Sequence, residues 1–206
     1  MRPQRTSNPR PRKRSLLIQC EGQKTEPNYL DELCKACGVR QRLAVKVRPG
    51  KGQNAVVTVE SAIAEGNRKL LGERLYDEVW CVLDVEHAAH EAKLNEAIVR
   101  AREHNIRMFL SNPSFEVWLL AHFERTKRDF ANGGAAEACL NTYWQKHFGS
   151  DYDKGDPELY VKLSDRVSTA LENAQWVREV FHENASCRDS NASTDVYQLV
   201  RHLLQP

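Results

Sequence analysis

Short apolar runs alternate with longer stretches of helical spacing along the first half of the chain. The runs LLIQC, LAVKVR, EVWCVL and IRMFL are rich in β-branched, aliphatic or aromatic residues, and they predict strands at 16–20, 43–48, 78–83 and 106–110. Apolar residues between these runs recur at helical spacing, which predicts helices over 26–37, 54–71 and 90–104. A strand followed by a helix, repeated, implies right-handed crossovers and a parallel sheet.

The pattern after residue 114 is helical. The stretches SFEVWLLAHFERTKRDF and AAEACLNTYWQKHF each predict a helix, and apolar residues recur at helical spacing from 157 to 183. A last helix is expected after Ser193 or Thr194 as its cap. The segments ANGGAA (131–136) and GSDYDKGDP (149–157) separate these helices. We therefore predict an α/β core over 15–130 and a helical extension over 131–206 that packs on it.

Charge is unevenly distributed along the 206 residues, although the net charge is only +2. Six basic residues and no acidic ones precede the first predicted strand: Arg2, Arg5, Arg10, Arg12, Lys13 and Arg14. A basic, proline-containing segment of this kind cannot build a core, so we predict a disordered arm over 1–14. Such an arm either contacts nucleic acid or serves as a solubilising tail, and the sequence leaves both open.

The composition favours a cytoplasmic protein. No apolar run is long enough to span a bilayer, and the first residues lack the apolar stretch of a secretion signal. Two of the six cysteines, Cys20 and Cys81, lie inside apolar runs, which suits a reducing compartment. Cys34 and Cys37 form a single C-x-x-C without a second pair at zinc spacing, so we expect them in the last turn of a helix.

Polar residues follow each predicted strand where it ends. Glu21 and Gly22 follow the first, Arg48 and the PGKG turn with Lys51 follow the second, Asp84 and Glu86 follow the third, and SNPSFE with Glu116 follows the fourth. Ligands of parallel sheets bind at this edge, where the loops converge. We expect Asn112 to cap a helix whose first residue is Pro113.

Several carboxylates at one edge raise one another's pKa unless a cation lies between them. Mg²⁺ prefers oxygen ligands and is commonly held by a few carboxylates together with substrate phosphate. The sequence therefore predicts a Mg²⁺ or Mn²⁺ site that includes Glu21, Asp84, Glu86 and Glu116. Glu26 is a further candidate, and the loop positions of Lys51 and Arg48 suggest contacts to a substrate phosphate.

Four segments together resemble the RloB-like family of bacterial abortive-infection proteins. They are CEGQKTEPNYL, VWCVLDVEH, SNPSFEVWLLAHF and STDVYQLVRHLL, in this order. The resemblance implies an α/β fold with a Toprim-like, Rossmann-like parallel sheet flanked by helices, followed by the helical C-terminal half. It also implies a magnesium site acting on phosphodiester bonds, built from a glutamate after the first strand and an Asp-x-Asp pair after a later one.

This resemblance assigns roles to three residues. Glu21 matches the glutamate, Asp84 matches the first aspartate of the pair, and Glu86 stands where the family pattern has the second aspartate. Asp84 and Glu86 would hold the metal, and Glu21 would be either a further ligand or the base that takes a proton from water. The implied function is a metal-dependent nuclease of an antiphage system. Its expected partners are DNA or RNA and an activating or regulatory protein, with a homo-oligomer left open.

Other interpretations stay open at this point. Glu26 lies in the first turn of a predicted helix, where the helix dipole favours a carboxylate whatever the function. The departure at Glu86 suits a module that binds nucleic acid or a phosphate ligand without turnover. A regulatory subunit of a defence complex, assembled through its helical half, is the third alternative.

Overall fold

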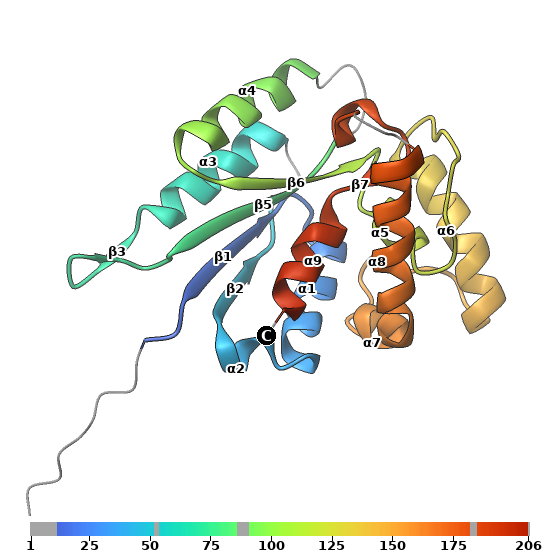
Figure 1. Cartoon of the computed structure of the whole chain (residues 1–206), viewed down its shortest axis with the longest axis horizontal. Coiled ribbons are helices and arrows are strands. Elements are labelled where there is room, and N and C mark those ends of the chain that lie inside the picture. Colours follow the sequence, from blue (N-terminus) through green and yellow to red (C-terminus); the bar gives the residue numbers. More distant parts are fainter. Residues whose placement is uncertain (1–11, 52–53, 86–90, 182–184, 206) are drawn as a thin grey trace, which may run out of the picture.

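The computed structural model describes residues 12–51, 54–85, 91–181 and 185–205 (Figure 1). The strands are β1 (Ser15–Cys20), β2 (Ala44–Arg48), β3 (Lys69–Leu70), β4 (Glu73–Arg74), β5 (Glu78–Asp84), β6 (Arg107–Asn112) and β7 (Ser193–Thr194). The helices are α1 (Thr25–Ala36), α2 (Val39–Arg42), α3 (Ala55–Gly66), α4 (Glu91–Glu103), α5 (Glu116–Leu120), α6 (Gly133–Phe148), α7 (Leu159–Leu163), α8 (Val167–Trp176) and α9 (Val196–Leu204).

The five-stranded sheet has the order β2-β1-β5-β6-β7. The first four strands are parallel, and β7 closes the edge of β6 antiparallel to it, pairing Ser111 with Thr194 and Asn112 with Ser193. All six residues of β1 are buried, as expected for a central strand covered on both faces. The predicted α/β class is confirmed, and the four predicted strands agree with β1, β2, β5 and β6 to within two residues.

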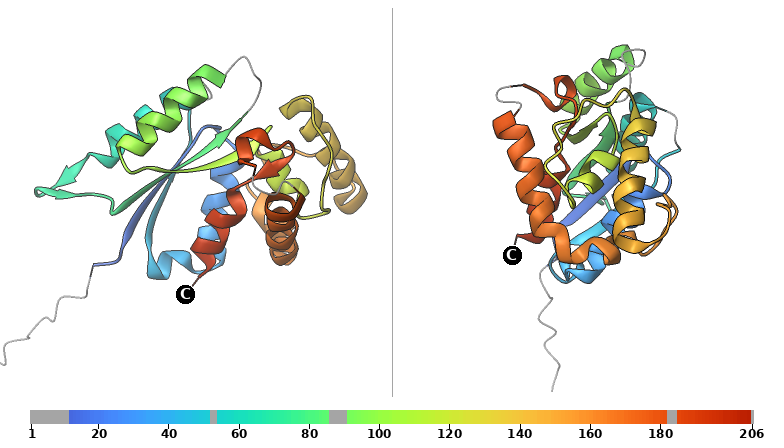
Figure 2. Two further views of the ribbon diagram at one scale, coloured as in Figure 1. Left: turned by 45° about the horizontal axis from the view of Figure 1, so that its top comes forward. Right: turned by 90° about the vertical axis from the view of Figure 1, so that its right-hand side faces the viewer.

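Helices cover both faces of the sheet, as Figure 2 shows. On one face, α3 and α4 pack through Val59, Ala62, Leu94 and Ala97 against Cys81 and other side chains of β5 and β6. On the other face lies a larger core that also includes residues of α1, α5, α6, α7, α8 and α9. The alternation along β5 separates the faces, since Trp80 and Val82 belong to the larger core and Cys81 and Leu83 to the smaller one.

Asparagine caps fix the starts of α3 and α6. The Asn54 side chain accepts the Val57 N–H at 3.2 Å, and the Asn132 side chain accepts the Ala135 N–H at 2.9 Å. These bonds satisfy N–H groups that a helix leaves without an internal partner. Gly149 ends α6 with φ of 70°, a conformation that glycine adopts without steric cost.

The predicted helix over 54–71 is too long. Helix α3 ends at Gly66, where a side chain would contact Val79, and the remainder forms the β3–β4 hairpin. Leu71 and Gly72 both have positive φ at its turn, which matches the twist of a two-residue hairpin. The hairpin projects from the body at the strand ends opposite α5 and α6 (Figure 1).

The long helix expected from residue 114 is also wrong. Helix α5 is short, and the segment after it runs without regular structure to α6. Tertiary hydrogen bonds hold it in this form, because Arg125 donates to the Asn173 side chain and Asn191 bonds both backbone groups of Phe130. Between 157 and 183, the described residues form α7, a 3₁₀ turn, α8 and a π-helical turn rather than one helix.

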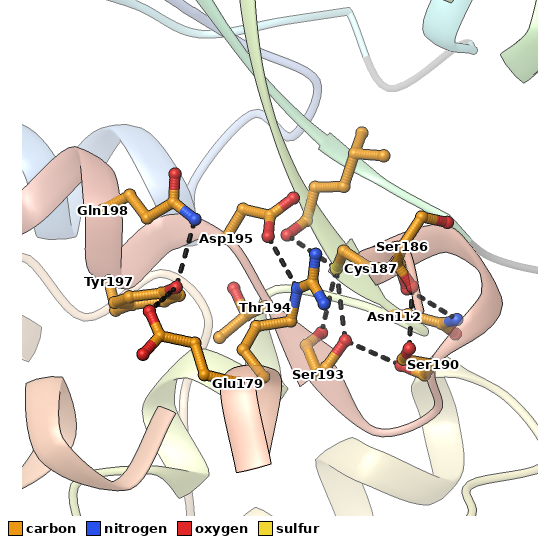
Figure 3. A network of polar contacts seen from close by, with 12 residues as sticks. Asn112, Glu179, Ser186, Cys187, Ser190, Ser193, Thr194, Asp195, Tyr197 and Gln198 are labelled. Atoms are coloured by element: carbon orange, nitrogen blue, oxygen red, sulfur yellow. Dashed lines mark hydrogen bonds and ion pairs between the residues drawn. The ribbon is translucent and has the colours of Figure 1, made fainter. Parts of the chain in front are cut away.

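A polar network ties the C-terminal segment to the end of β6 (Figure 3). The Asn112 amide donates to the carbonyls of Cys187 and Arg188 at 3.1 and 2.8 Å, and the Ser193 hydroxyl donates to the Ser190 carbonyl at 2.7 Å. Asn112 is therefore the last residue of a strand and not a helix cap, and α5 begins only at Glu116. The network fixes the direction in which the chain leaves β6.

The basic arm lies mostly outside the described residues, which begin at Arg12. The last three residues of the predicted arm contact the domain. Arg12 donates to the Arg74 carbonyl at 3.1 Å, Lys13 donates to the Arg40 carbonyl at 3.0 Å, and Arg14 pairs with Glu78. Residues 12–14 thus have hydrogen-bond and ion-pair partners beside β1.

None of the described helices is both long and apolar enough to cross a membrane.

Leu140→Ala should test whether the helical half and the sheet unfold together. Leu140 lies fully buried in α6, within the core that also contains Leu16 and Ile18 of β1. We expect a loss of about 2–5 kcal/mol in the free energy of unfolding and a single cooperative transition. Unfolding in urea, monitored by circular dichroism, measures both. Val161→Ala, at a half-exposed position of α7, should change it by less than about 0.5 kcal/mol. Two transitions, of which Leu140→Ala shifts one, would instead indicate separate domains over 15–130 and 131–206.

Candidate active-site cleft

A cleft of about 510 Å³ opens at the carboxyl ends of the parallel strands. It lies between the starts of α1 and α6 and the segment that leads into α5. Its lining residues are Gly22, Gln23, Lys24, Thr25, Glu26, Asp84, Ser114, Phe115, Glu116, Asn132, Gly133, Gly134 and Lys154. Three of the carboxylates considered from the sequence, Glu26, Asp84 and Glu116, therefore share one cavity.

Glu21 joins the ends of β1 and β5. Its N–H donates to the Val82 carbonyl at 3.0 Å, and its Oε2 accepts the Asp84 N–H at 3.1 Å. Glu21 is not among the described residues that line the cleft, and its charge contributes, after burial, to a raised pKa of the Cys81 thiol. The Glu21 carboxylate therefore lies near Cys81 of the smaller core and fixes the backbone of Asp84 through this hydrogen bond.

Asp84 ends β5 and lines the cleft. It follows Trp80 and Val82 at two-residue spacing, so it belongs to the face of the sheet that carries α1 and α5. Glu86 lies outside the described residues.

Glu26 is packed against the backbone of the turn after β1. The Gly22 N–H donates to Glu26 Oε1 at 2.9 Å, and a Cβ at Gly22 would lie 2.1 Å from Glu26 Oε2, so a side chain there would displace the Glu26 carboxylate. Burial raises the pKa of Glu26; hydrogen bonds from its own N–H and from Gly22 oppose the rise, and the charge of Glu116 adds to it. Glu26 is thus a buried carboxylate of the cleft, and not only a first-turn carboxylate.

Glu116, the first residue of α5, is the second buried carboxylate. The Ser114 hydroxyl donates to its Oε2 at 2.5 Å, and the Lys154 ammonium lies 3.3 Å from its Oε1. The same ammonium lies 2.9 Å from Oε2 of Glu137 in α6. Burial lowers the pKa of Lys154, but the charges of Glu116 and Glu137 outweigh it and raise the pKa above its ordinary value. Lys154 therefore stays charged at neutral pH.

The start of α6 adds partial positive charge to the lining of the cleft. Asn132, Gly133 and Gly134 line the cleft there, and a Cβ at Gly133 would lie 3.2 Å from that of Ser114. The N–H groups at the start of a 16-residue helix carry partial positive charge. The cleft therefore combines acidic side chains with groups that attract an anion.

The two predicted phosphate contacts lie apart from this cavity. Arg48 pairs with Glu65 of α3, which also holds Arg68 at 2.8 Å. The side chain of Lys51 is exposed, and its carbonyl accepts a hydrogen bond from Gln23 at 3.0 Å. Neither is among the described residues that line the cleft, although Gln23 places the Lys51 loop at its rim.

A hydrated Mg²⁺ fits the donors of the cleft. Within 12–51, 54–85, 91–181 and 185–205, no three His, Cys, Asp or Glu residues form a group that could hold a metal ion. Mg²⁺ does not require such a cage, because one or two carboxylates, waters and substrate phosphates complete its shell. Asp84, Glu116 and the Ser114 hydroxyl are hard oxygen donors of the kind it prefers.

Sequence reasoning missed Lys154, Ser114 and the paired glycines of α6. The segments that contain Lys154 and the glycines were interpreted only as breaks between helices. The signal at residues 132–134 was an asparagine cap directly before two glycines, which permits close approach to a helix start. No comparable signal marks Lys154, since its contacts with Glu116 and Glu137 arise only in the folded chain.

Residues 16–203 match the model of a family described as RloB-like protein, which covers most of the chain. No curated protein and no solved structure matches the chain significantly.

Glu26→Gln should become more stable relative to wild type as the pH rises in the presence of a chelator. The folded pKa of Glu26 lies above its ordinary value of 4.5, so the unfolded chain gives up this proton at lower pH than the folded protein. Folding stability is therefore lost as the pH rises from that value through the folded pKa. Glutamine still accepts the Gly22 N–H but does not ionise.

Urea unfolding of Glu26→Gln and wild type across this pH range measures the effect. Glu172→Gln, at an exposed position of α8, should leave the difference in free energy of unfolding constant. A difference for Glu26→Gln that does not change with pH would contradict the raised pKa.

Proposed function

The chain belongs to the RloB-like protein family, and from that premise we propose that it is a divalent-metal-dependent nuclease that cleaves phosphodiester bonds in nucleic acid. We further propose a Toprim-like relationship for its sheet and a role as effector of an antiphage system. The observation that carries the proposal is the convergence of Asp84, Glu26 and Glu116, from three elements, on one cleft at the carboxyl ends of parallel strands.

Asp84 and Glu116 would hold the ion in this proposal, with Glu21, Glu26 and Glu86 as further candidates. A bound Mg²⁺ or Mn²⁺ would neutralise charge that develops on the phosphoryl oxygens and lower the pKa of a bound water. Crowded carboxylates support a cation site, since like charges without one disfavour ionisation of their neighbours. Glu21 contributes by fixing the end of β5, because it accepts the Asp84 N–H.

The remaining groups of the cleft suit a phosphodiester. Asn132, Gly133 and Gly134 at the start of α6 line the cavity, and so do Lys24 and Lys154. These groups would orient a backbone phosphate and offset its charge without reorganisation. Lys51, at the rim, would contact the strand further along.

A binding module without turnover is the second candidate. It is favoured by the absence, among the described residues, of three ligands close enough to hold a metal without substrate. In that case the cleft would bind nucleic acid or a phosphate ligand and release it unchanged. The two functions differ in whether a phosphodiester bond is cleaved.

Asp84→Ala and Glu116→Ala should each lower cleavage at least about 100-fold, because each removes a charge from the reacting centre. Glu21→Ala should also lower it, through the loss of the bond that fixes Asp84. The assay is cleavage of a panel of labelled DNA and transfer RNA with Mg²⁺ or Mn²⁺. Chelation should abolish the activity, and Glu172→Ala should match wild type.

Two results would contradict the nuclease. Metal-dependent binding without cleavage, also in extract of phage-infected cells that could supply an activating partner, would favour the binding module. If Glu21→Ala, Asp84→Ala and Glu116→Ala all leave the cleavage rate unchanged, the cleft is not the catalytic site. This result would favour a regulatory subunit.

A further inference from the structure

Lys154 places an ammonium group where the cleft is most acidic. It lies in the loop between α6 and α7, and its Nζ is 3.3 Å from Glu116 Oε1 and 2.9 Å from Glu137 Oε2. One ammonium thus serves two carboxylates from different elements. Its side chain is 47% exposed, so it can leave either partner without opening the core.

Hydrogen bonds hold the backbone of this loop. The Asn28 side chain of α1 donates to the Gly155 carbonyl at 3.4 Å, and the Gly155 N–H donates to the Asp153 side chain at 2.7 Å. Lys162 of α7 pairs with Asp156 of the same loop at 2.6 Å. Any change of partner by Lys154 is therefore a movement of its side chain.

The two carboxylates differ in their surroundings. The Glu116 side chain is 5% exposed and its Oε2 is taken by the Ser114 hydroxyl, so Oε1 is the atom that meets the ammonium. The Glu137 side chain, on α6, is 39% exposed. A buried carboxylate loses more solvation than an exposed one, so it has the greater need of a cation.

We propose that Lys154 is the resident cation of the cleft and sets its affinity for the divalent metal. A metal ion that binds Glu116 Oε1 displaces the ammonium, which Glu137 then retains. This inference rests on the proposed function, since it assumes that Glu116 is a metal ligand. The physical reason is that two cations at one carboxylate oxygen repel each other strongly in a site partly shielded from water.

Lys154→Met should bind Mn²⁺ about three- to tenfold more tightly than wild type, because the metal no longer competes with an ion pair to a buried carboxylate. Isothermal titration of the whole protein, without nucleic acid, measures this affinity. Lys154→Arg, which keeps the charge, should stay near wild type. Lys162→Met removes the same charge from the same region but leaves the Lys154 pairs in place, so it should also stay near wild type.

A crystal structure with Mn²⁺ gives an independent test. The distance from Lys154 Nζ to Glu116 Oε1 should exceed about 4 Å, the limit of an ion pair, while the contact to Glu137 remains. Unchanged or weaker Mn²⁺ binding by Lys154→Met, an equal gain in Lys162→Met, or an ammonium still at Glu116 beside the metal would overturn the inference.

The proposed function can fail separately. If wild type cleaves nucleic acid and binds Mn²⁺ but Lys154→Met shows no gain, only the role of Lys154 is wrong. If wild type binds no Mn²⁺, with or without nucleic acid, both the metal-dependent function and the role of Lys154 are wrong. If Lys154→Met binds Mn²⁺ more tightly but the protein cleaves no nucleic acid, the role of Lys154 is supported and the nuclease function is wrong.

Discussion

The carboxylate of Glu26 packs against the backbone of Gly22, and the geometry of the cleft follows from this contact. The Gly22 N–H donates to Glu26 Oε1 at 2.9 Å, and a side chain at residue 22 would displace this carboxylate. The Gly22 carbonyl accepts the Gly50 N–H at 2.9 Å, and a Cβ at Gly50 would collide with the Glu21 carbonyl. The end of β1, the loop after β2 and the start of α1 are thereby held within hydrogen-bonding distance of one another.

Two buried carboxylates next to this turn cost solvation free energy, and the surrounding polar groups offset it. Glu26 accepts its own N–H and the N–H of Gly22, and Glu116 accepts the Ser114 hydroxyl and pairs with the Lys154 ammonium. These compensating groups come from separate parts of the chain. The acidic character of the cleft therefore depends on the helical half as well as on the sheet.

The apolar runs predicted β1, β5 and β6 because these strands are largely buried, and they also predicted the more exposed edge strand β2. The order of strands and helices then brought Asp84 and Glu116 to one edge. Local pattern could not predict β7, whose two residues pair only because the Asn112 network holds that segment beside β6. The local pattern also could not predict that Arg48 pairs with Glu65, or that Lys154 pairs with Glu116 in the cleft. Such contacts join residues far apart in sequence, and spacing carries no information about them.

The pairing of β7 with β6 has a consequence for the order in which the protein is made. Glu21, Glu26, Asp84 and Glu116 leave the ribosome well before Ser193 and Thr194, which close the sheet edge beside the strand that leads to Glu116. Lys154, which pairs with Glu116, also follows all four carboxylates in the sequence. During synthesis Glu116 therefore exists without the Lys154 ammonium and beside an open sheet edge, and both are supplied only when most of the chain has emerged.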